Sequence, residues 1–264
     1  MPKFAANLTM LFTELPFLER FDAACRAGFT GIEYLFPYDF QADGLLSRLR
    51  RFGLRQVLHN LPAGDWAGGE RGIACIPGRE EEFREGVERA IRYATTLGCQ
   101  QLNCLVGITP RDADTERVDA TLMENLRHAD ERLAKEGIAL LIEPVNTRDI
   151  PGFHLNRTAQ ARRIIEAGGL TNTFIQYDAY HMQIMEGDLA RTIATNLDLI
   201  RHIQIADNPG RNEPGTGEIN YEFLFRHLDS IGYDGWIGCE YKPLGRTCDR
   251  LGWRPAAAPA KAVA

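Results

Sequence analysis

The stretch EEEFREGVERAIRYATTLGCQQLNCL, residues 80–105, carries the pattern that decides the fold. Its first part, Glu80–Leu97, has a helical pattern and ends at Gly98, the residue type that commonly caps a helix in the left-handed conformation. Gln101–Leu105 follows as a short apolar run of the kind that forms a buried strand. The stretch therefore predicts one helix, one tight loop and one strand in succession.

The same unit recurs along the chain. Three more helical patterns, each followed by a glycine, are Pro16–Ala27 with Gly28, Arg117–Glu136 with Gly137, and Thr158–Ala167 with Gly168. Each glycine precedes an apolar run by a few residues, which predicts a left-handed cap in the loop between helix and strand. The eight predicted strands are Phe4–Leu8, Gly31–Phe36, Arg55–His59, Gln101–Leu105, Ala139–Glu143, Phe174–Asp178, His202–Ile205 and Trp236–Glu240.

Regular alternation of strand and helix predicts a parallel sheet with right-handed crossovers. Eight such units in 264 residues favour a closed (β/α)8 barrel, which typically needs about 250 residues. No GxGxxG motif follows the first strand, so a nucleotide-binding open sheet has no support. We expect one α/β barrel domain over residues 1–253 and a flexible tail over residues 254–264.

Composition and charge narrow the class of protein. The net charge of −6 argues against a nucleic-acid binder, which usually carries a basic excess. No apolar run approaches the roughly 18 residues of a membrane-spanning helix, and the N-terminus lacks a signal-peptide pattern. The six cysteines form no CxxC pair, which predicts free thiols in a reducing compartment. We expect a cytoplasmic enzyme; a homo-oligomer is left open.

One connection is unusually long. Between the third strand and its helix, Asn60–Arg79 reads NLPAGDWAGGERGIACIPGR, with five glycines, two prolines, Trp66 and Arg71. A loop of this length in a compact domain is usually functional. We interpret it as a lid over the barrel mouth, and a decorated surface loop is the alternative.

Several polar residues stand at predicted strand ends, where barrels of this kind place their active sites. The third strand ends in His59, and the fifth, sixth and eighth end in Glu143, Asp178 and Glu240. Three carboxylates that converge on one volume repel one another, and a bound divalent cation is the simplest remedy. Together with the amide of Gln204 they suit a hard cation, Mg²⁺ or Mn²⁺.

Each of these residues also has a structural interpretation. A single glutamate at a strand end often pairs with an arginine, and Gln204 alone is more often a hydrogen-bonding filler. His59, His181 and His202 taken singly are more often satisfied core or rim histidines. Lys242 shares a face with Glu240, two residues earlier, but is also compatible with the surface.

The chain resembles a known family over roughly residues 4–243. The strings that carry the resemblance are LHNLPAGDWAGGERGIACIPGREEEFREG from Leu58, LIEPVN from Leu141, IPGFHL from Ile150, IQYDAYHMQIMEGDL from Ile175 and HIQIADNPGRNEPGTGEINY from His202. They are closely similar to hydroxypyruvate isomerases of the xylose-isomerase-like barrel superfamily. That superfamily also holds sugar 3-epimerases and endonuclease IV.

The resemblance implies site residues as well as a fold. It implies that four residues hold a divalent metal: Glu143, Asp178, Gln204 and Glu240. Glu143 and Glu240 match the paired acid and base, while His181 and Arg211 match residues that contact substrate in the related epimerases. The epimerases usually have histidine in place of Gln204, which separates this chain from them.

Hydroxypyruvate and tartronate semialdehyde interconvert through an enediolate, with one glutamate as base and the other as acid. The substrate carboxylate needs a cation, for which Arg71, Arg211 and Lys242 are candidates, with His59 and His181 as neutral partners. The nearest alternative is an isomerase of a four-carbon 2-oxo-tetronate. A sugar 3-epimerase, a nuclease of the endonuclease IV type and a non-catalytic binding barrel are less consistent with these residues.

Overall fold

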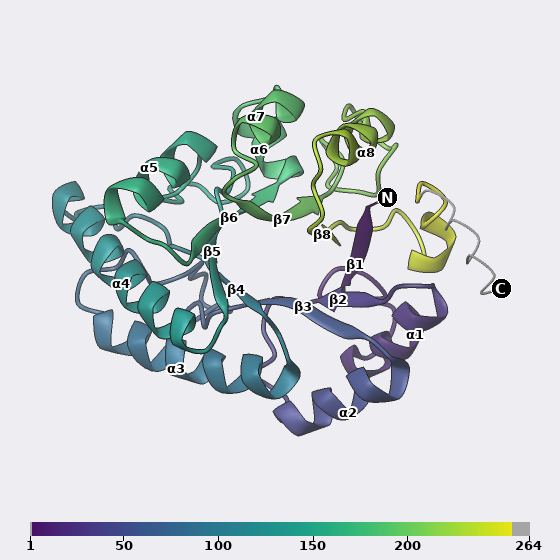
Figure 1. Cartoon of the computed structure of the whole chain (residues 1–264), viewed down its shortest axis with the longest axis horizontal. Helices are drawn as coiled ribbons and strands as arrows, with labels where there is room; N and C mark the ends of the chain where they lie inside the picture. Colours follow the sequence, from purple (N-terminus) through teal and green to yellow (C-terminus); the bar gives the residue numbers. More distant parts are fainter. Residues whose placement is uncertain (1, 255–264) are drawn as a thin grey trace.

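The computed structural model describes residues 2–254, and its strands form one closed barrel in sequence order, β1 to β8 (Figure 1). All eight neighbouring pairs, including β1 with β8, are parallel. The strands are β1 Lys3–Asn7, β2 Gly31–Glu33, β3 Arg55–Asn60, β4 Gln101–Cys104, β5 Ala139–Ile142, β6 Thr173–Asp178, β7 Ile200–Ile205 and β8 Trp236–Cys239. The predicted (β/α)8 barrel is therefore confirmed.

Helices surround the barrel and cover its outer face (Figure 1). Within the described residues they are α1 Arg20–Arg26, α2 Ala42–Phe52, α3 Glu80–Leu97, α4 Thr115–Lys135, α5 Thr158–Gly168, α6 Ala179–Met185, α7 Leu189–Thr195 and α8 Tyr221–Ser230. Two short 3-10 helices are η1 Phe17–Glu19 and η2 Thr247–Arg250. In this part of the chain no helix is both long and apolar enough to cross a membrane.

The helix that follows the long connection shows why these units form. Helix α3 buries one stripe of apolar side chains spaced three and four residues apart, against the barrel: Phe83, Val87, Ala90, Ile91, Ala94 and Leu97. Gly98 ends the helix at a φ of 67°, which a residue without Cβ adopts without strain. The chain can then turn at once into β4, as the sequence predicts.

Several bounds differ from the sequence predictions; the predicted helix Pro16–Ala27, for example, is the 3-10 helix η1 followed by α1. The glycine with left-handed φ after α5 is Gly169, at 62°, whereas Gly168 is the last helical residue. The second strand ends at Glu33 and not at Phe36, because the backbone leaves the sheet there. The six cysteines are free as predicted, although Cys248 is exposed. Of the predicted tail 254–264, only Arg254 is among the described residues.

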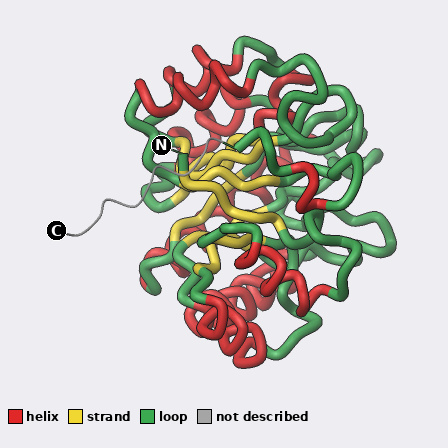
Figure 2. Tube along the Cα trace, turned by 90° about the vertical axis from the view of Figure 1, so that its right-hand side faces the viewer, coloured by secondary structure: helices red, strands yellow, loops and turns green. Residues whose placement is uncertain are grey.

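The loops at the two ends of the barrel differ in length. Figure 2 shows the longer loops gathered at the end away from the N-terminus, where the carboxyl ends of the strands lie. The long connection 61–79 belongs to this end, and an antiparallel bridge from Gly72 to Val106 pins it beside the exit of β4. The contact is close, since a Cβ on Gly72 would lie 1.9 Å from the Leu105 carbonyl oxygen.

Candidate active site

A cavity of about 510 Å³ opens among the loops that follow the strands. It is lined by residues at or beyond the carboxyl ends of all eight strands and by residues of the long connection. The lining residues are Thr9, Met10, Leu35, Asn60, Trp66, Arg71, Leu105, Glu143, Val145, Asp149, Ile150, Gln176, His181, Arg211, Glu240 and Lys242. The cavity thus brings together two predicted catalytic glutamates and four of the five predicted substrate contacts.

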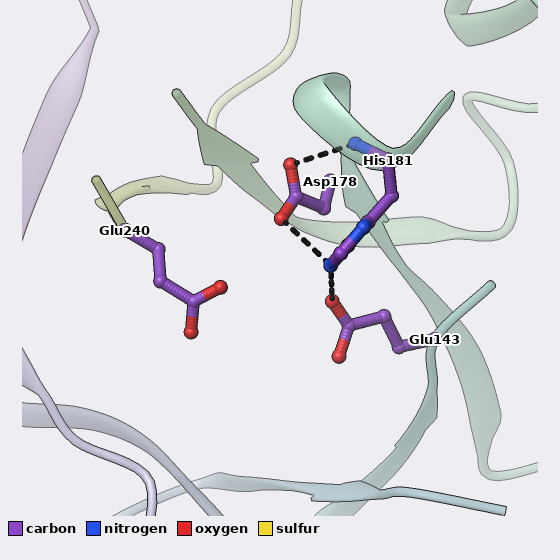
Figure 3. A group of neighbouring side chains, drawn as sticks. All are labelled: Glu143, Asp178, His181 and Glu240. Carbon is purple, nitrogen blue, oxygen red and sulfur yellow. Dashed lines mark hydrogen bonds and ion pairs between the residues drawn. The ribbon is translucent and has the colours of Figure 1, made fainter. Parts of the chain in front are cut away.

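Four buried side chains form a compact cluster at this cavity: Glu143, Asp178, His181 and Glu240. One potential ligand atom of each lies within 4.8 Å of those of the others. Figure 3 shows the carboxylates of Glu143 and Asp178 on either side of the His181 ring, with the Glu240 carboxylate facing the same space. The backbone places them there because Glu143 and Glu240 directly follow β5 and β8, and Asp178 ends β6.

The two carboxylate oxygens of Asp178 have different surroundings. Its Oδ1 caps α6 and accepts hydrogen bonds from the backbone N–H of Tyr180 at 2.8 Å and of His181 at 3.4 Å. Its Oδ2 is buried and has no hydrogen-bond partner. That oxygen lies 3.5 Å from His181 Nε2 and 3.8 Å from Arg211 Nη2. A buried carboxylate oxygen without a hydrogen bond is a position that a cation would satisfy.

The electrostatics of the cluster favour an added positive charge. Burial, with the charges of Glu240 and Asp178, raises the pKa of Glu143 well above its ordinary range. Burial also raises the pKa of Asp178, and it raises that of Glu240 to about 7 despite the opposing charge of Arg211. The pKa of His181 is lowered by burial and by Arg211, so this imidazole is neutral. Three buried carboxyls therefore resist joint ionisation unless a cation joins them.

The donor set fits a divalent cation. Three carboxylates at one point suit Mg²⁺ or Mn²⁺, and the unpartnered Asp178 Oδ2 supplies a free ligand atom. His181 is less suited to ligate, because Asn146 Nδ2 donates to its Nδ1 at 2.6 Å. A neutral ring that accepts at Nδ1 carries its proton on Nε2, which faces Asp178 and Glu143. His181 is then a hydrogen-bond donor to the cavity.

Arg211 supplies the positive charge nearest to the cluster. Its Nη2 donates to Glu240 Oε2 at 2.6 Å, and its guanidinium lies 5.1 Å from the centre of the Tyr180 ring. The residue has a φ of 55°, a strained conformation for a side chain of this size. Asp207 holds the surrounding loop, because its Oδ2 accepts from three consecutive backbone N–H groups, those of Gly215, Thr216 and Gly217.

Two more cationic side chains that the sequence predicts for the site line the cavity, one from the connection after β3 and one from the segment after β8. Arg71, in the long connection, lies 4.1 Å from the centre of the Trp66 ring and donates to the carbonyl oxygens of Trp66 and Glu70. These contacts hold the guanidinium in one orientation. Lys242 follows Glu240 by two residues, and both residues line the cavity. With Arg211, three cationic side chains therefore line the cavity.

Two residues that the sequence analysis assigned to the site, His59 and Gln204, are not among the residues that line the cavity. His59 is buried between Tyr34 and Tyr38, with ring centroids 6.5 and 6.1 Å away, and is not among the lining residues. Burial lowers its pKa to about 3. Since side chains alternate along a strand, the next residue, Asn60, faces the cavity instead. Gln204 is buried, and its Oε1 accepts from Gln176 Nε2 at 2.6 Å.

The sequence analysis missed several polar groups of the site. Asn103 Nδ2 donates to Glu143 Oε2 at 3.0 Å, and Asn7 Nδ2 donates to Glu240 Oε1 at 3.2 Å. Asp149 lines the cavity and accepts from Tyr180 and Asn146. Asn7 and Asn103 stand inside predicted strands, so a polar amide in an apolar run was the available signal.

The chain is similar to proteins of known sequence and structure. The model of the xylose isomerase-like TIM barrel family matches residues 21–261. The chain is 57% identical to the hydroxypyruvate isomerase of Escherichia coli K12 over 96% of this chain and 98% of that protein. It is 49% identical to the 2-oxo-tetronate isomerase of Cupriavidus necator, over 96% and 97%.

A crystal structure from Brucella melitensis, described as an AP endonuclease of family 2, superimposes with a TM-score of 0.94 at 49% identity. The superposition covers 96% of this chain and 98% of that one. Relatives named as sugar-acid isomerases thus match this chain over 96% of its length. The chain therefore belongs to the hydroxypyruvate isomerase and 2-oxo-tetronate isomerase family of xylose isomerase-like TIM barrels, and is an isomerase.

Proposed function

We propose that this isomerase interconverts hydroxypyruvate and tartronate semialdehyde (2-hydroxy-3-oxopropanoate). The observation that carries the proposal is the buried cluster of Glu143, Asp178, His181 and Glu240 at the cavity, with three cationic side chains around it. The 57% identity to a hydroxypyruvate isomerase supports the choice of substrate. Two carboxyls with raised pKa values are suited to exchange protons with carbon near neutral pH.

The reaction moves one hydrogen between adjacent carbons. One glutamate carboxylate, of Glu143 or Glu240, takes a proton from C3 of hydroxypyruvate, and the C3–H electron pair forms the C2–C3 double bond of an enediolate. The other glutamate, as a carboxylic acid, returns a proton to C2. The hydroxyl proton at C3 leaves and the oxygen at C2 gains one, so that the carbonyl group moves from C2 to C3 and no atom is lost.

The chain's own groups supply most of what this step needs. Glu143, Asp178, Gln204 and Glu240 are the residues that we propose to hold a divalent cation, Mg²⁺ or Mn²⁺. When bound, that cation supplies a Lewis acid that stabilises negative charge on the enediolate oxygens. We propose that His181 Nε2–H donates a hydrogen bond to a substrate oxygen, supported by the contact of its Nδ1 with Asn146.

The substrate carboxylate meets the cations of the cavity. Arg71 is the strongest candidate, because its guanidinium is already held by Trp66 and presents a planar set of donors. Arg211 already donates to Glu240 Oε2, so it is less free than Arg71 to meet the substrate carboxylate. Lys242 adds a third charge on the same side as Glu240.

A four-carbon 2-oxo-tetronate is the second candidate substrate, and the 49% identity to an isomerase of that acid favours it. The two proposals are separated by kcat/KM, measured for both acids with Mg²⁺ present. A higher value for hydroxypyruvate supports the main proposal, and a higher value for the four-carbon acid replaces it. Cleavage of abasic-site DNA serves as a third assay, in which we expect no product because the −6 net charge and the carboxylates of the cavity repel a polyanion.

A further inference from the structure

One buried carboxylate is not used by the proposed reaction and does not line the cavity. Glu33, the last residue of β2, is 1% exposed and accepts three hydrogen bonds. Its Oε1 accepts from Asn7 Nδ2 at 2.9 Å and from Gln204 Nε2 at 2.8 Å. Its Oε2 accepts from His202 Nε2 at 2.8 Å. Strands β1, β2 and β7 thus meet at one carboxylate.

The barrel is shaped to hold Glu33 in this position. A Cβ on Gly238 of β8 would lie 2.4 Å from both carboxylate oxygens, so only glycine leaves them room. Below it, Gln101 Nε2 lies 3.3 Å from His202 Nδ1. Since an amide nitrogen only donates, His202 accepts at Nδ1 and donates to Glu33 from Nε2. The contact with Gln101 of β4 therefore places the proton of His202 on Nε2.

From Glu33 the contacts run to two groups of the proposed site. Asn7 Nδ2 donates to both Glu33 and Glu240, and its Oδ1 accepts from the backbone N–H of Thr9 at 3.0 Å, which fixes the direction of the amide. Gln204 must direct its Nε2 at Glu33, because a carboxylate accepts but does not donate. Its Oε1 is then turned toward Gln176, which lines the cavity.

We propose that Glu33 is a positioning residue that sets the direction of the Gln204 amide oxygen and, through Asn7, of the Glu240 carboxylate. The Gln204 part of this inference rests on the proposed function, in which that oxygen is a metal ligand. Outer partners of metal ligands commonly contribute a factor of about 10–100 to metal affinity or activity. Glu33 does not line the cavity and has no hydrogen bond to the four residues of the cluster, although its charge adds to the burial that raises the pKa of Glu240.

The test compares Glu33→Gln with Ile32→Val, a neighbour in β2 whose buried side chain lies on the other face of the strand. Glutamine keeps the shape of Glu33 but has one acceptor oxygen in place of two, so the donors of Asn7, Gln204 and His202 cannot all keep their partner and the network that holds Gln204 is disturbed. We expect Glu33→Gln to weaken Mn²⁺ binding, measured by calorimetry on metal-free protein, by roughly 10–100-fold. We expect kcat on hydroxypyruvate to fall by a similar factor with KM changed by less than about threefold.

Ile32→Val should leave the Mn²⁺ dissociation constant and kcat at wild-type values even where it lowers the melting temperature. Asn7→Ala, a second variant, removes the link to Glu240 and one of the three donors to Glu33 but leaves the contact between Glu33 and Gln204. It should lower kcat without the full loss in Mn²⁺ affinity. Wild-type Mn²⁺ binding and kcat in Glu33→Gln would overturn the inference, as would equal losses in Ile32→Val. If the wild-type protein does not turn over hydroxypyruvate, the proposed substrate fails, and Mn²⁺ affinity still decides the role of Glu33.

Discussion

Replacing Glu240 with glutamine should change how the stability of the metal-free protein depends on pH. Burial raises the pKa of this carboxyl from 4.5 to about 7 in the folded chain. A folded-state pKa above the unfolded-state value means that folding takes up a proton. The stability held by the protonated carboxyl is therefore fully present below the unfolded-state pKa and is lost as the pH rises through the folded-state pKa.

The size of the effect follows from the shift. Each pKa unit corresponds to about 1.4 kcal/mol of stability, and most of the stability change caused by this shift occurs between pH 5 and pH 8. Over that interval the wild-type protein should lose about 2.5 kcal/mol of unfolding free energy relative to Glu240→Gln, whose amide does not titrate. For a chain of this length, the difference in melting temperature between Glu240→Gln and wild type should change by roughly 5–10 °C from pH 5 to pH 8.

The assay is thermal unfolding followed by circular dichroism, in EDTA, at several pH values for both proteins. Glu222→Gln is the matched control, because it removes the same charge from a side chain that is 84% exposed. A difference between Glu240→Gln and wild type that stays constant with pH would refute the reasoning, since the carboxyl would then not be held neutral by burial.

Three further predictions concern the cavity and its loop. Arg71→Lys loses the planar guanidinium and its contact with Trp66, so KM for hydroxypyruvate should rise about tenfold with little change in kcat, as steady-state kinetics would show; an unchanged KM would assign the substrate carboxylate to another cation. Gly72→Ala should lower the free energy of unfolding by more than about 2 kcal/mol in urea titrations, because its φ is 111° and the new Cβ would meet the Leu105 carbonyl oxygen. The control Gly69→Ala should cost less, because Gly69 also has a positive φ, 100°, but open space around its Cβ position. Equal losses in the two variants would argue against a long connection held beside β4. Adding Mg²⁺ to EDTA-treated protein at about 100 times its dissociation constant should stabilise the fold by about 2.7 kcal/mol. Differential scanning fluorimetry would detect this as a rise in melting temperature. A melting temperature that does not rise at any Mg²⁺ concentration would contradict the proposed cation site.

The barrel was predictable because its signals are local. Helix α3 and Gly98 agree with the sequence pattern residue for residue, and the repeated unit predicts the parallel order of the strands. Boundaries were less accurate where two glycines follow one another, as Gly168 and Gly169 do after α5. Either residue can adopt a positive φ, and the helix length needed to reach β6 decides between them.

The site was predictable where the end of a strand identified the residue. Glu143, Asp178 and Glu240 were found in this way, because each stands where its strand leaves the barrel. His59 also stands near a strand end, but the rule does not say which face a side chain takes, and Asn60 faces the cavity. Glu33 was missed because the second strand is shorter than its apolar run, so that the true end carries a glutamate.

The most direct test of the central claim follows hydroxypyruvate by proton NMR in D2O, with Mg²⁺, for wild type, Glu143→Gln and Glu240→Gln. Two glutamates acting as base and acid predict that wild type forms tartronate semialdehyde carrying deuterium from solvent at C2. Each variant should keep its circular dichroism spectrum and lose product formation by roughly 10²–10⁴-fold. Near-normal formation of the product by either folded variant would contradict the paired-glutamate account.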